Sequence, residues 1–200
     1  MAAENRRAKT RTIAITGLMM AISIILAFTP IGTIPLPIVS VTIAFLPAII
    51  SAMLLGFFPG LAVAATAGLC SMTRAFIMPT GILFPFIQNP LVSVFPRMLI
   101  AVTVFLMFRI LTKTKLPKSI SIGAAAAIGS ITNTVGFLGM MWLIYGARLH
   151  NAVVENTAFT TVWAFFISIV TTNAIMEIFV NTIIATLVVI TMRKAGLSKI

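Results

Sequence analysis

Four ionisable or amide side chains lie deep inside long apolar stretches of this chain, and they are Arg74, Arg97, Asn133 and Glu177. Placing a charge in such surroundings is costly, at least about 2.5 kcal/mol at the centre of a bilayer, so these groups require a partner or a function. Guanidinium groups bind carboxylates well, and amides can both donate and accept hydrogen bonds. These side chains could therefore bind a small polar molecule through ionic contacts and hydrogen bonds.

A polar stripe surrounds the glutamate. Asn173, Glu177 and Asn181 recur every four residues in an otherwise apolar segment, so they share one face of a helix. Such a stripe can bind a ligand, or it can serve only for hydrogen bonds between helices. The same two interpretations apply to Arg74 and Arg97, either of which can pair with Glu177.

The composition excludes a soluble globular domain. Of 200 residues, 60% are apolar, and only 14 Lys or Arg and 3 Asp or Glu are present. Globular chains are about 45–50% apolar and about 25% charged, so this chain has lipid as its solvent. The net charge of +11 does not indicate nucleic-acid binding, because the basic residues are distributed between apolar runs. Cys70 is the single cysteine, which excludes an intramolecular disulfide.

The apolar runs predict an all-α integral membrane bundle of six transmembrane helices in a single domain, 1–200. A hydrocarbon core about 30 Å thick requires roughly 20 apolar residues per helix. A β-barrel would need alternating segments of about ten residues, which the sequence lacks. The predicted spans are 12–28, 41–58, 60–78, 91–111, 119–145 and 158–192.

Positive charge predicts that both termini are cytoplasmic. Basic residues gather in the N-terminus 1–11, in the loop 112–118 and in the tail 193–200, and six crossings put all three on one side. The first outer loop, 29–40, contains Pro30, Pro35 and Pro37 and no charge. Prolines keep a segment extended, so this loop is either a gating lid over a cavity or a plain connector.

The polar side chains converge on one depth in this arrangement. At 1.5 Å per residue, Arg74, Arg97, Asn133 and Glu177 all lie roughly 21–23 Å from the cytoplasmic boundary. Four helices therefore contribute polar groups to the outer third of the membrane. Two arginines against one glutamate leave a surplus positive charge, which favours a small anionic ligand.

The sequence contains no recognisable catalytic centre. Neither a nucleotide-binding G-x-x-x-x-G-K-[ST] motif nor H-E-x-x-H occurs, and His150 is placed in an outer loop away from the polar layer. We therefore expect no enzyme activity, no cofactor and no metal. A membrane enzyme using Arg97, Glu177 and His150 is the disfavoured alternative.

Several segments resemble one family: the substrate-binding S components of energy-coupling factor (ECF) vitamin transporters, in the riboflavin/pantothenate-type branch. They are 6–11 (RRAKTR), 46–50 (LPAII), 56–60 (GFFPG), 130–134 (SITNT) and above all 86–97 (FIQNPLVSVFPR). The resemblance implies six helices that hold one vitamin near the outer face of a bacterial cell membrane. It also implies docking on a transmembrane T subunit driven by two cytoplasmic ATPase subunits.

Docking in this family uses small residues spaced by four on the first helix. In this sequence Gly17 and Ala21 are the nearest match, because Leu18 breaks the spacing that begins at Ala14. Small residues at this spacing allow two helices to approach closely. The same pair can also serve packing within the bundle.

The surplus positive charge and the resemblance together lead to the hypothesis of a pantothenate-binding S component. In it Arg97 binds the carboxylate, Asn133, Asn173 and Glu177 bind hydroxyl and amide groups, and Arg74 assists or neutralises Glu177. Asn89 and the loop 29–40 close the outer mouth. The alternatives are a riboflavin-binding S component and a stand-alone small-solute facilitator.

Overall fold

The chain folds into a bundle of helices with one short pair of strands. A computed structural model describes residues 2–34, 41–79 and 82–196. The first half contains α1 (Ala2–Phe28), η1 (Pro30–Gly32), β1 (Thr33–Ile34), β2 (Val41–Thr42), α2 (Leu46–Leu54) and α3 (Phe57–Ile77). The second half contains α4 (Phe84–Ile87), α5 (Pro90–Ser93), α6 (Phe95–Leu111), α7 (Lys118–Asn156), α8 (Val162–Ile169), η2 (Val170–Ala174) and α9 (Ile175–Lys194).

Within the described ranges, five helical segments are long and apolar enough to cross a membrane. They comprise α1, α3, α5 with α6, α7, and α8 through α9. The second predicted span is different, because the helix expected over 41–58 covers only the 9 residues of α2. A helix of that length rises about 13.5 Å, less than half of the hydrocarbon core.

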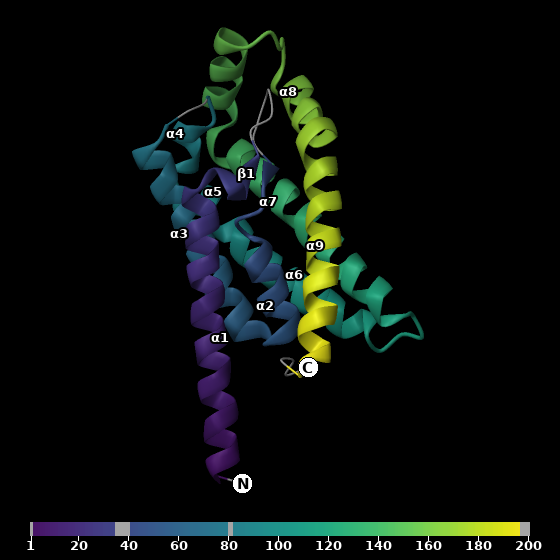
Figure 1. Ribbon diagram of the computed structural model, residues 1–200. Helices are drawn as coiled ribbons and strands as arrows, with labels where there is room; N and C mark the ends of the chain where they lie inside the picture. Colours follow the sequence, from purple (N-terminus) through teal and green to yellow (C-terminus); the bar gives the residue numbers. More distant parts are fainter. Residues whose placement is uncertain (1, 35–40, 80–81, 197–200) are drawn as a thin grey trace.

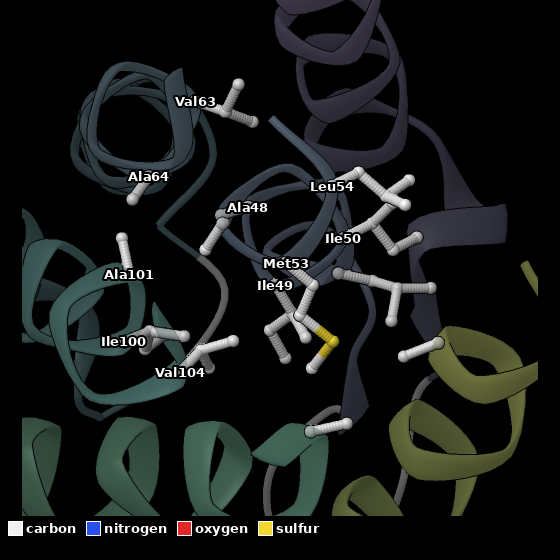
Figure 2. Close-up of a cluster of buried hydrophobic side chains, with 14 of the residues drawn as sticks. Ala48, Ile49, Ile50, Met53, Leu54, Val63, Ala64, Ile100, Ala101 and Val104 are labelled. Atoms are coloured by element: carbon white, nitrogen blue, oxygen red, sulfur yellow. The ribbon is translucent and has the colours of Figure 1, made fainter. Parts of the chain in front are cut away.

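The short α2 is stable because protein surrounds it. All its residues are buried, and Figure 2 shows Ala48, Ile49 and Met53 among side chains of α3 and α6. Before it, β1 and β2 pair antiparallel, and the Ile43 amide donates to the Gly32 carbonyl at 2.8 Å. Non-helical backbone at membrane depth is tolerated where it is buried in protein and hydrogen-bonded, so a full-length helix is not required here.

The turn after α2 depends on glycine. Gly56 has φ of 103°, a conformation that side chains with a Cβ rarely adopt. Gly60, one turn into α3, lies so close to α2 that an added Cβ would be 2.7 Å from the Ala52 Cα. These two positions allow α3 to return directly along α2.

Helix α7 is much longer than the predicted span 119–145. It has 39 residues, about 58 Å, so it projects beyond a hydrocarbon core. His150 lies exposed on this helix rather than in a loop, which corrects the sequence-based placement. Helix α1 likewise begins at Ala2, so the basic residues near the N-terminus are part of a helix.

Both chain ends lie toward the same end of the bundle (Figure 1). Helices α1 and α3 run in the same direction, and from α3 onward the long helices alternate in direction (Figure 1). The first outer loop is only partly described: η1 and β1 cover 30–34, and residues 35–40 of the predicted gating loop lie outside the described residues, as do 197–200 of the predicted tail.

Gly60→Ala should lower the free energy of unfolding by about 1–3 kcal/mol, because the new methyl group overpacks the contact between α2 and α3. The matched control is Gly139→Ala in α7, where no atom lies within 4 Å of an added Cβ. That change should be neutral or stabilise by up to about 1 kcal/mol. Thermal unfolding in detergent measures both, and equal stability of the two variants would contradict the close approach of α2 and α3.

Candidate functional site

One cavity of about 170 Å³ lies among α3, α6, α7 and the α8–α9 segment. The short elements β2 and α4 complete its wall. Its lining is mixed, with charged, amide and hydroxyl groups facing aromatic and aliphatic side chains. The lining residues are Thr42, Ser71, Arg74, Leu83, Phe84, Ile87, Arg97, Asn133, Thr134, Phe137, Leu138, Ile169, Asn173, Ala174 and Glu177.

The structure brings five of the six predicted binding residues to this cavity. Arg74, Arg97, Asn133, Asn173 and Glu177 all line it, although they come from separate helices and are up to 103 positions apart in the sequence. They meet because α3, α6, α7 and α9 pack side by side, α3 against α6, α6 against α7, and α7 against α9.

Asn89 does not belong to the described lining. Its Oδ1 accepts from the Leu91 amide at 2.9 Å and so caps α5, and its Nδ2 donates to the Tyr145 hydroxyl at 3.1 Å. Tyr145 also packs against Phe86, with ring centroids 5.2 Å apart. Asn89 therefore fixes α5 against α7, and α5 in turn precedes the helix that carries Arg97.

The guanidinium of Arg97 is buried, with 8% of the residue exposed. It donates to the Val92 carbonyl at 3.5 Å and to the Ser71 hydroxyl at 3.4 Å, and it lies 5.0 Å from the centroid of the Phe137 ring. Both hydrogen bonds are long, and an arginine has five N–H donors. Its neighbours therefore orient the guanidinium group, and its remaining N–H groups can donate hydrogen bonds to an anion.

Arg74 enters the cavity from α3. Its Nη1 donates to the Ala27 carbonyl at 3.2 Å, which links α3 to the last turn of α1. It lines the same cavity as Arg97, so two cationic side chains contribute to one cavity wall. The local electrostatic potential there favours an anion.

The Glu177 carboxylate accepts a hydrogen bond from a side-chain amide. The Nδ2 of Asn133 donates to Glu177 Oε1 at 2.9 Å, and the backbone of Thr42 also hydrogen-bonds to the carboxylate. Within the described part of the chain, the hydrogen bonds of Arg97 go to Val92 and Ser71 instead. The arrangement therefore differs from a simple Arg97–Glu177 ion pair, and it joins α7 to α9.

The structure adds lining residues that the polar pattern did not single out. Ser71 lies three residues before Arg74, and Phe137 lies four after Asn133. Those spacings put each pair on one helix face, so helical periodicity applied to the charged residues was the available signal. Leu83 and Phe84 carry no such signal, because they come from a short segment outside the predicted spans.

These features define a multi-pass helical membrane protein with a polar cavity between its helices. The model of the family described as "ECF transporter, substrate-specific component" matches residues 11–189, and the chain belongs to this family. The chain is also similar to the pantothenic acid transporter PanT of Lactococcus lactis subsp. cremoris (strain MG1363). The two are 27% identical over 206 residues, which cover 95% of this chain and 97% of the relative.

The two predicted docking residues lie on the surface of the bundle. Gly17 and Ala21 are exposed on α1, and no described atom outside the local backbone of α1 lies within 4 Å of a Cβ added at Gly17. In the described structure they therefore do not serve close packing inside the bundle, and their face of α1 is available to lipid or to another helix.

Asn133→Leu should lower the free energy of unfolding by about 1–3 kcal/mol, because it leaves the buried Glu177 carboxylate without its side-chain donor. Asn181→Leu is the matched control: Asn181 is 0% exposed, and its amide has no partner among the described residues. Losing that amide should be neutral or stabilising. Thermal unfolding in detergent compares them, and a harmless Asn133→Leu would contradict the stated role of this bond.

Proposed function

We propose that this protein is the S component that binds pantothenate for ECF-driven uptake. The observation that carries the proposal is the cavity lined by Arg74 and Arg97, where Glu177, the one carboxylate of the described lining, is already hydrogen-bonded by Asn133. The two guanidinium groups then attract an anionic ligand, with Arg97 as the partner of its carboxylate. Asn133, Asn173 and Glu177 face the hydroxyl and amide groups of the vitamin.

Two further observations favour pantothenate over riboflavin. A relative that aligns with nearly the whole chain is a pantothenic acid transporter. The cavity volume of about 170 Å³ is also below the roughly 300–1,000 Å³ of sites for drug-sized ligands. A compact, flexible carboxylate suits such a volume better than a three-ring flavin does.

The membrane arrangement we propose has six passes, with both termini in the cytoplasm of a bacterial cell. In it α2 and the strand pair before it form the second, partly non-helical pass inside the ring of longer helices. The shared position of the chain ends (Figure 1) and the basic residues in α1, near residues 112–118 and at the end of α9 support this orientation. The loop 29–40 is the proposed gate, since Thr42, just after it, lines the cavity.

Uphill transport by this chain requires separate energy-supplying subunits. We propose a transmembrane T subunit and two cytoplasmic ATPases as these partners, because the sequence carries no nucleotide-binding motif of the Walker type. Docking would use the face of α1 that exposes Gly17 and Ala21, where small side chains permit a partner helix to approach closely.

Calorimetry on the purified protein should show binding of pantothenate and much weaker binding of panthenol, the alcohol that lacks the carboxylate. Arg97→Gln should weaken pantothenate binding by roughly 10- to 100-fold, since it removes a charge-assisted hydrogen bond in a buried site. It should leave panthenol binding nearly unchanged. Arg148→Gln, an exposed arginine on α7, is the control. Binding of riboflavin in preference to pantothenate would overturn the assignment.

Gly17→Leu with Ala21→Leu should abolish ATP-dependent uptake in proteoliposomes that contain the complete transporter, yet leave pantothenate affinity unchanged. Leucines at these positions keep a partner helix from approaching closely. Gly139→Leu, which places the same side chain in open space on α7, should not affect uptake. Transport by this chain alone, without ATPases, would instead support the facilitator alternative.

A further inference from the structure

The segment that joins α8 to α9 is not an ordinary α-helix. Its five residues, Val170–Ala174, form a π-helical turn, which contains more residues per turn than an α-helix. Consequently Ile169 and Ala174, five positions apart, both line the cavity together with Asn173. π-helical turns within α-helices are frequent at functional sites.

Asn173 is the polar side chain that this turn directs to the cavity. The residue is 3% exposed, and neither its Oδ1 nor its Nδ2 has a hydrogen-bond partner among the described residues. The polar side chains beside it do have hydrogen-bond partners: Thr171 donates to the Ile167 carbonyl at 2.9 Å, and Thr172 donates to the Ser168 carbonyl at 2.7 Å. Buried polar groups without partners are rare in native proteins, so an unpaired amide in a cavity wall indicates a ligand.

A second unpaired amide atom belongs to another residue of the cavity lining, Asn133. Asn133 donates through its Nδ2 to Glu177, but its Oδ1 has no partner within the described structure. In the wall formed by α7 and η2, two amide oxygens and one amide NH2 group thus have no partner among the described residues. Amide oxygens accept hydrogen bonds only, so a ligand must bring donors to this wall. Hydroxyl groups meet the requirement, because each can donate and accept.

We propose that Asn173 is a specificity-determining residue that binds a hydroxyl group of the ligand. Its Oδ1 accepts from the hydroxyl, and its Nδ2 donates to that oxygen or to a neighbouring carbonyl oxygen. This inference rests on the proposed function, in which the arginines hold the carboxylate. The site then selects hydroxylated carboxylates over carboxylates that have the same carbon skeleton but no hydroxyl groups.

The test compares pantothenate with its analogue in which both hydroxyl groups are replaced by hydrogen, by calorimetry on the full-length protein. The wild type should bind pantothenate at least about 100-fold more tightly, because the analogue leaves buried amide atoms unpaired. Asn173→Leu should weaken pantothenate binding by roughly 10- to 100-fold and leave the analogue unaffected or bound more tightly. Asn173→Ala, which adds no apolar bulk, should reduce the discrimination in the same direction.

Asn181→Leu is the matched control, because Asn181 lies on the same stripe and is also buried. Like Asn173, its amide has no partner among the described residues, but it is not part of the described lining. It should change neither affinity. The decisive quantity is the ratio of the affinity for pantothenate to the affinity for the analogue. If this ratio is unchanged in both Asn173 variants, or falls equally in Asn181→Leu, the proposed role of Asn173 is wrong. Pantothenate binding by the wild type would still support the proposed function. A wild type that binds neither compound contradicts the proposed function itself.

Discussion

A buried guanidinium group constrains the arrangement of the helices in this bundle. Arg97 lies near the start of α6. Its charge is stabilised by the Ser71 hydroxyl of α3, the Val92 carbonyl of α5 and the face of the Phe137 ring of α7. A bilayer offers no water at this depth, so these groups replace hydration. Because these three partners come from three different helices and must meet at one point, satisfying Arg97 fixes three segments relative to α6.

The remaining wall of the cavity depends on a second polar contact. The hydrogen bond from Asn133 to Glu177 connects α7 with α9, and Thr42 brings the end of the strand pair to the same carboxylate. Away from these contacts, α2 fills the bundle with apolar side chains from all its faces. The buried charged groups are therefore gathered around the cavity, and the core around α2 is apolar.

Much of this arrangement is encoded locally and could be predicted. Long apolar runs predicted the helical membrane fold, and counting 1.5 Å per residue predicted one common depth for Arg74, Arg97, Asn133 and Glu177, which all line one cavity. Helical spacing also grouped Asn173 with Glu177. These predictions work because a membrane forces the backbone into regular helices, so position in the sequence converts directly into height.

The rest depends on tertiary contacts that no local pattern contains. Apolar content cannot distinguish a crossing helix from a short one enclosed by others, so α2 was predicted at full length. The contact between Asn89 and Tyr145 could not be predicted, because the two residues are 56 positions apart in the sequence. The π-helical turn at Val170–Ala174, which contains Asn173, has no simple sequence signature.

The most direct test of the central claim is an experimental structure of the protein with pantothenate bound. The account predicts density for the vitamin between α3, α6, α7 and α9, with its carboxylate within hydrogen-bonding distance of the Arg97 guanidinium. A vitamin bound elsewhere, or bound in this cavity with its carboxylate directed away from both Arg97 and Arg74, would contradict the account.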